Sequence, residues 1–190
     1  MFASKRHTVT LRDVAAHCDD PFDVLRKLAA PDRISIGQVA CVAGADAALQ
    51  CSLALDWQDI GLRRTMIAIM VRWIRRGYPL MDDADVIEDL GALREWAEGD
   101  ESVDLRLRRR MLLKEVTNMP SEQPHTSDET AIAQTWMLLE VALQLSPCMS
   151  KWTNCGAASV TMVGAQLIAA AVSDAKERQQ QVEDLQLAFP

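Results

Sequence analysis

The sequence predicts an all-α fold, a single-domain bundle of about seven to eight helices that spans residues 1–190. Apolar residues recur at helical spacing along most of the chain, and a Ser, Thr or Asp stands where a helix cap is expected before most of these stretches. Hydrophobic residues make up 49% of the chain and aromatic residues only 5%, so Ala, Leu, Val and Met must fill the core, which suits helix-on-helix packing. A chain of 190 residues is long enough for one domain with a substantial core.

The first two predicted helices occupy the start of the chain. Thr8 or Thr10 is placed to cap the first helix, and residues 1–8 are expected to form an N-terminal arm. Asp20 is the predicted cap of the second helix, with Pro21 at its first position, where a helix start favours proline. One face of the first helix carries Leu11, Val14, Ala15 and Cys18.

Two longer helices follow. Ser35 is the predicted cap of a slim, alanine-rich helix over about 36–55. Asp56 is the predicted cap of a helix over 57–76, whose apolar residues cover more than half of its circumference. A helix with so much apolar surface belongs in the middle of a bundle.

Arg63 lies inside the apolar arc of that helix, one turn before Met66 and Ile67. If Arg63 is a structural buried charge, it needs a carboxylate partner, because an unpaired buried charge is too costly. The alternative is that its long stem carries the guanidinium outward to water.

The next two predicted helices have opposite charge. After a break at Gly77, Tyr78 and Pro79, Asp82 or Asp83 caps a helix with an inner stripe of Val86, Leu90, Leu93 and Ala97. Residues 81–101 contain nine acids and one base, a net charge of −8, and Ser102 is the predicted cap of a basic helix beyond them. Two alternatives remain open: the basic helix lies beside the acidic one and screens it, or the acidic face is exposed and meets a partner.

The C-terminal third is predicted to be a loop and further helices. The loop covers 118–125, a capping box opens a helix over 126–145, and a small-residue-rich helix covers 156–171. Residues 175–190 read as a possible polar tail. The small-residue helix is too short and too interrupted by polar residues to span a membrane, so no membrane association is expected.

Composition argues against a nucleic-acid partner. The net charge is −7, whereas a general nucleic-acid binder needs surplus positive charge to replace the counterions on phosphates. Residues 8–18 resemble the first helix of a LacI-type helix-turn-helix, but the aspartates Asp19, Asp20 and Asp23 then stand where DNA phosphate would lie. Such a charge would suit a basic protein partner instead.

No catalytic residue, metal site or cofactor site is expected from the motifs. The chain has no glycine-rich phosphate loop and no nucleophile elbow, and neither its histidines (7, 17, 125) nor its cysteines (18, 41, 51, 148, 155) have metal-ligand spacing. Asp85, Glu88 and Asp89 share a helix face and keep a cation site open as a minority alternative. The odd number of cysteines and the lack of an apolar run after Met1 favour reduced thiols in the cytoplasm, with Cys18 and Cys41 as buried side chains.

A family resemblance covers about residues 63–171. It rests on an apolar helix with Arg72 and Trp73, a break from Pro79 to Asp83, and the pattern Ile87-x-x-Leu-x-x-Leu-x-x-Trp96-x-x-Gly99. With these features the chain resembles the helical immunity proteins of bacterial polymorphic toxin systems, in particular the Imm5-like immunity family. It departs from that family's Asp-x-Arg-Pro-Arg run, where it has Asp-Asp-Ala-Asp, and it has no histidine after His125.

The resemblance implies a cytoplasmic antitoxin that binds a cognate toxin domain, which is basic where it acts on nucleic acid, and occludes it through an acidic face. The predicted partner-binding residues are Asp82, Asp83, Asp85, Glu88, Asp89, Glu95 and Trp96. Trp96 is either an interface anchor or, because of its place beside the inner stripe, a core residue. The alternatives are a helical adaptor, secretion chaperone or homodimeric interaction module, and third an enzyme or metal-binding bundle. The oligomeric state, monomer or homodimer, stays open.

Overall fold

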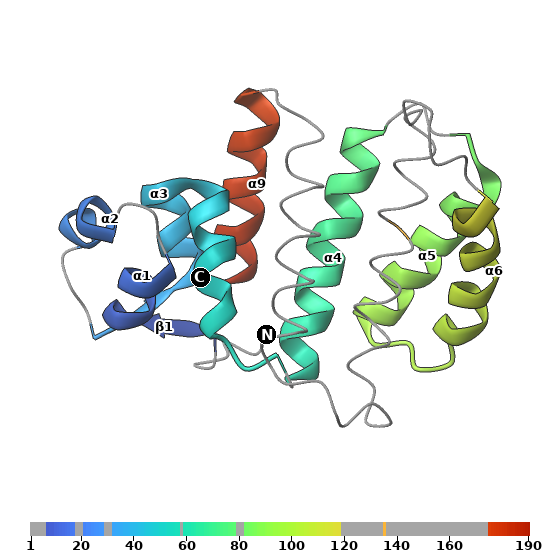
Figure 1. Ribbon diagram of the computed structural model, residues 1–190, viewed down its shortest axis with the longest axis horizontal. Helices are drawn as coiled ribbons and strands as arrows, with labels where there is room; N and C mark the ends of the chain where they lie inside the picture. Colours follow the sequence, from blue (N-terminus) through green and yellow to red (C-terminus); the bar gives the residue numbers. More distant parts are fainter. Residues whose placement is uncertain are drawn as a thin grey trace. The chain divides into compact units, whose positions relative to one another are not determined.

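The computed structural model describes residues 7–17, 21–28, 32–57, 59–78, 82–118, 135 and 175–190. Most of these residues are helical, which confirms the predicted all-α class (Figure 1). The elements are β1 (Thr8–Thr10), α1 (Leu11–His17), α2 (Pro21–Lys27), β2 (Arg33–Ser35), α3 (Ile36–Cys51), η1 (Ser52–Ala54), α4 (Ile60–Gly77), α5 (Ala84–Glu98), α6 (Leu105–Asn118) and α9 (Ala175–Ala188). The predicted loop after Asn118 and the helices predicted over 126–145 and 156–171 lie outside the described residues, except Thr135, which is buried and helical.

The chain forms two compact units. Unit 1 comprises residues 1–57 and 154–190, and its described elements are β1 to η1 together with α9. Unit 2 comprises residues 58–153, and its described elements are α4, α5 and α6. The single-domain organisation expected from the sequence stays a prediction, because each unit is defined by its own internal contacts.

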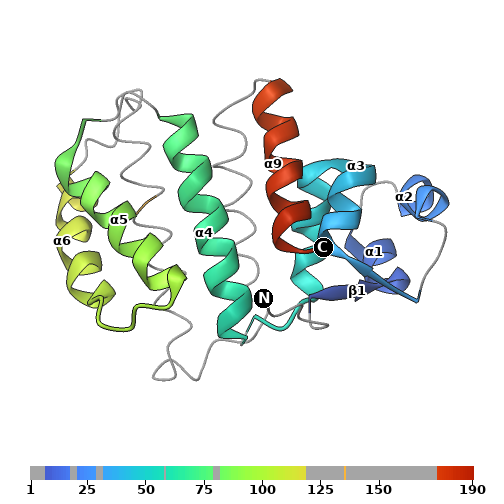
Figure 2. The same ribbon diagram turned by 180° about the vertical axis from the view of Figure 1, so that it is seen from behind.

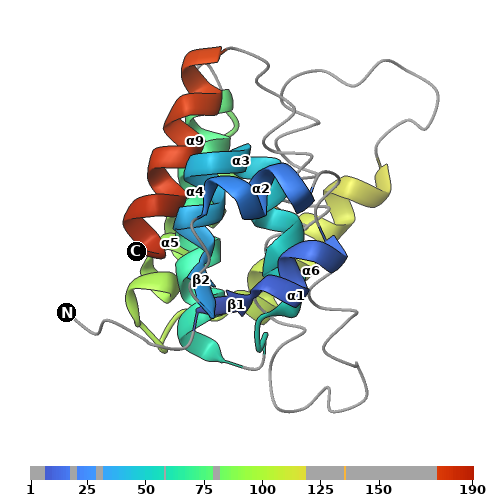
Figure 3. The ribbon, with the colours of Figure 1, turned by 90° about the vertical axis from the view of Figure 1, so that its left-hand side faces the viewer.

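A short antiparallel strand pair lies near the start of unit 1. β1 begins at Thr8, so Thr8 is not part of the arm expected over residues 1–8, and residues 1–6 lie outside the described residues. β1 and β2 lie side by side (Figure 3), with Val9 paired opposite Ile34, and both side chains are buried. The Arg33 Nε donates to Thr8 Oγ1 at 2.8 Å across the pair. Three-residue strands are too short to produce a recognisable period of two, so sequence periodicity could not reveal them.

Local capping explains where α1 begins, whereas Asp20, the predicted cap of α2, lies outside the described residues. Thr10, one of the two predicted caps, accepts a hydrogen bond from Asp13 N at 3.2 Å, and the Asp13 carboxylate accepts one from Thr10 N at 2.8 Å. On the predicted inner face Val14 is buried but Ala15 is exposed, so this face is narrower than expected. α2 begins at Pro21, as predicted.

α3 starts with the predicted cap but ends earlier than predicted. Ser35 and Gln38 form a reciprocal capping box, with hydrogen bonds of 3.1 and 2.9 Å. Gly44 breaks the helix internally at φ 86°, a left-handed conformation that glycine adopts without a steric penalty. The helix ends at Cys51, where η1 begins, and the Trp57 Nε1 donates to Ser52 O in η1 at 2.8 Å.

The predicted start of α4 was wrong by three residues. Trp57, expected as the first helical residue, is buried in unit 1, and Asp56 is exposed. Asp59 is the actual cap, since its carboxylate accepts from Gly61 N at 2.8 Å. Asp59 rather than Asp56 is therefore the cap, because its carboxylate can reach the backbone N–H of Gly61 in the first turn of α4.

α9 corrects the prediction of a polar tail over 175–190. It packs against α3, and both views from front and back show the two helices together (Figures 1 and 2). Gly37 N donates to Phe189 O at 3.1 Å, and a Cβ on Gly37 would lie 2.8 Å from Gln186 Cα. The Arg178 Nη1 also donates to Asp46 Oδ1 of α3 at 3.1 Å.

The packing of α9 against α3 could not be predicted from the sequence, because the inner face of α9 is mostly polar. Glu177, Gln181 and Asp184 lie at i, i+4 and i+7 and are all buried together with Leu185. The Gln181 Nε2 donates to Glu177 Oε1 at 3.4 Å. Buried polar groups are tolerated where they satisfy one another, so a helix face without an apolar stripe can still be an inner face.

One described stretch, Ile36–Ala54, is long and apolar enough to match a membrane span by length and composition alone. Half of its apolar window is buried within the protein, and a core helix passes the same test.

Unit 2 is built around α4, which packs against α5, while α6 follows along α5 (Figure 1). Every apolar residue predicted to form the arc of α4 is buried except Ile60, which is exposed. On α5 the predicted stripe residues Val86, Leu90 and Leu93 are buried and Ala97 is partly so. The apolar face of α5 is therefore turned inward, and its charged side chains are exposed except that of Asp89, which is buried.

Candidate partner-binding surface

The start of α5 uses one of the predicted partner-binding acids as a cap. The Asp83 Oδ1 accepts from Asp85 N and Val86 N, both at 3.0 Å. A carboxylate in this position also interacts favourably with the positive end of the helix dipole. Helix capping alone therefore accounts for an aspartate at position 83, without a role in binding a partner.

Arg108 of α6 neutralises two further predicted acids. Its Nη2 donates to Glu88 Oε1 at 2.6 Å, and its Nη1 donates to Asp89 Oδ1 at 3.1 Å. For these two acids the structure favours the alternative in which the basic helix screens the acidic one. Asp89 is only 5% exposed, so its assignment to a partner-binding surface is corrected.

The two carboxylates respond to Arg108 in opposite ways. Burial raises the pKa of Asp89, and the hydrogen bond and charge of Arg108 only partly offset that rise. The hydrogen bond from Arg108 lowers the pKa of the exposed Glu88. The pKa of Arg108 is raised, first by its hydrogen bond to Glu88.

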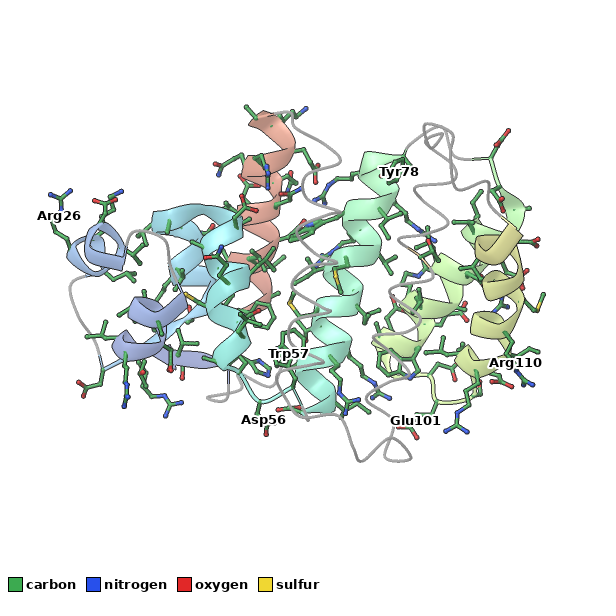
Figure 4. The ribbon with its side chains drawn as sticks, in the orientation of Figure 1. Arg26, Asp56, Trp57, Tyr78, Glu101 and Arg110 are labelled. Atoms are coloured by element: carbon green, nitrogen blue, oxygen red, sulfur yellow. The ribbon has the colours of Figure 1, made fainter. Side chains whose placement is uncertain are left out.

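Trp96 belongs to the contact between α4 and α5. It is half-buried, and the Arg64 guanidinium carbon lies 5.4 Å from its ring centroid, which is a cation–π geometry. Arg64 Nη2 also donates to Glu101 Oε1 at 3.2 Å, in the loop between α5 and α6 (Figure 4). Of the two sequence readings of Trp96, packing within unit 2 is the favoured one.

The other three predicted acids remain outward. Asp82, Asp85 and Glu95 are exposed and make no ion pair or side-chain hydrogen bond with any described residue. Asp85 and Glu95 lie ten residues apart, which is about 15 Å along a helix. Asp82 precedes the cap of α5, and ten residues at 100° each place Asp85 and Glu95 about 80° apart around the helix, so these acids are scattered rather than gathered in a dense patch.

Sequence reasoning missed a set of exposed apolar side chains on α5 and α6. Ile87 is 45% exposed, Leu107 48% and Met111 54%. Leu107 and Met111 are four residues apart and stand among the arginines of α6, so each interrupts a polar strip at helical spacing. That interruption is the feature of the sequence from which these exposed apolar side chains could have been predicted.

The sequence also predicted the burial of several single side chains, namely Arg63 and two cysteines. Arg63 is only 6% exposed, which favours the buried alternative over an outward stem. Cys41 is exposed, contrary to the expectation of a buried side chain, whereas Cys51 is buried; neither forms a disulfide bond. Cys18 lies outside the described residues.

Within the described part of the chain, no three His, Cys, Asp or Glu side chains gather as a metal site would require. Comparison with known proteins found no match: no family model, no curated protein and no solved structure matches the chain. The resemblance to immunity proteins accordingly stays a prediction that rests on the residues between 63 and 171.

Proposed function

We propose that this chain is a non-enzymatic, cytoplasmic immunity protein that binds a cognate toxin domain and neutralises it by occlusion. The partner is a basic protein, and the docking surface is the outer side of α5. The observation that carries the proposal is that Asp82, Asp85 and Glu95 stay exposed and unpaired among the described residues, while Arg108 of the neighbouring basic helix pairs with Glu88 and Asp89.

The mechanism follows from unscreened charge on a rigid support. α5 is capped at both ends, by Asp83 and by Gly99, and its inner stripe is buried, so its outer acids are held in fixed positions. Fixed acids attract a basic surface during diffusional encounter and lie where phosphates would lie on a toxin that acts on nucleic acid. The bound protein then blocks the substrate path by its bulk, which needs no catalytic group.

The proposal is tested by identifying the partner and then removing the charge. Tagged full-length chain captures proteins from its native host, and the candidate is accepted as a toxin only if it stops growth when expressed alone and coexpression of this chain restores growth. Reversal of two acids (Asp82→Lys with Glu95→Lys) should weaken binding by roughly 5- to 50-fold at low salt. Isothermal calorimetry at two salt concentrations measures the affinity.

A matched control carries the same change of net charge elsewhere. Asp32 and Glu183 are exposed acids of unit 1, so Asp32→Lys with Glu183→Lys should leave the affinity within about twofold of the parent. Both variants should keep the parent melting temperature to within about 3 °C, because exposed substitutions cost little. Equal loss of affinity in both variants would mean that net charge, not the α5 surface, matters.

A homodimeric interaction module is the second candidate function. It is favoured by a separate observation, the exposed Ile87, Leu107 and Met111, which the acidic-surface mechanism does not use.

A further inference from the structure

We draw no further inference here: the strongest candidate, the exposed apolar side chains Ile87 on α5 and Leu107 and Met111 on α6, carries none, because nothing in the part of the chain that the structure describes shows what covers them.

Discussion

At the scale of single residues, one guanidinium has opposite effects on two neighbouring carboxylates. Arg108 binds both Glu88 and Asp89, yet the pKa of Glu88 is lowered and the pKa of Asp89 is raised. The difference is burial, because Asp89 has lost the water that would stabilise its charge and Glu88 has not. Charge on a helix therefore cannot be added up from the sequence without knowing which side chains are covered.

This contrast predicts opposite pH dependences for two variants. Because its folded-state pKa is raised, Asp89 contributes stability below its unfolded pKa, and this contribution is lost as pH rises through the folded pKa. Because its folded-state pKa is lowered, Glu88 contributes stability above its unfolded pKa, and this contribution is lost as pH falls through the folded pKa. Relative to the parent, Asp89→Asn should become less stable as pH falls from about 6 to about 3. Glu88→Gln should be slightly less stable near pH 6 and approach the parent in acid.

Urea unfolding at a series of pH values measures both differences in the free energy of unfolding. Each variant serves as the control for the other, since both replace a carboxylate on α5 with its neutral amide. Parallel pH dependences would contradict the assignment of Asp89 as the desolvated member of the pair.

At the scale of elements, two glycines inside helices have different reasons to be glycine. Gly37 of α3 lies against the C-terminal end of α9, where a Cβ would meet the Gln186 Cα at 2.8 Å and the Leu185 carbonyl oxygen at 3.1 Å. For Gly91 of α5, no atom of the described residues lies within 4 Å of that position. Gly37 permits a contact between helices of unit 1, whereas no such contact among the described residues requires glycine at position 91.

The same substitution at these two positions should therefore change stability in opposite directions. We expect Gly37→Ala to lower the free energy of unfolding by about 1–3 kcal/mol, because backbone atoms must shift to admit the methyl group. Gly91→Ala should raise it by about 0.5–1 kcal/mol through higher helix propensity. Thermal denaturation at low protein concentration compares the two, and a stabilised Gly37→Ala would show that α9 does not approach α3 so closely.

At the scale of the whole molecule, charge is distributed unevenly. The chain carries −7 and residues 81–101 alone carry −8, so the remainder is close to neutral. That segment lies entirely within unit 2, whereas unit 1 combines the β1–β2 pair with α1, α2, α3 and α9. Packing within unit 1 and exposed charge on unit 2 are thus largely separate properties of this protein.

The two compact units give a prediction for local opening. Gly37→Ala should speed amide hydrogen exchange in α3 and α9 and leave α4 and α5 near their parent rates, because the disturbed contacts are all inside unit 1. Hydrogen exchange with mass spectrometry on the full chain measures this. Equal acceleration in all four helices would instead support the single cooperative domain that the sequence predicted.

Sequence by itself determined the features that depend on near neighbours along the chain. The all-α class, the cap at Ser35 and the inner stripe of α5 follow from hydrogen bonds within one turn and from helical periodicity. The caps Thr10 and Asp83 were each one of two candidates that the sequence offered. The acidic segment over residues 81–101 was also predictable, because its net charge depends only on which residues it contains. These interactions are local, so the order of residues encodes them directly.

Only the tertiary structure decided what depends on residues far apart in the chain. Arg108 lies about twenty positions from the carboxylates it neutralises, and Gly37 meets the end of α9. Asp89 is consequently buried and does not belong to the predicted surface, and residues 175–188, predicted as a polar tail, form a helix packed on α3. Asp82, Asp85 and Glu95 are exposed. The physical reason is that burial and charge pairing depend on which elements come together, and periodicity within one helix carries no information about its neighbour.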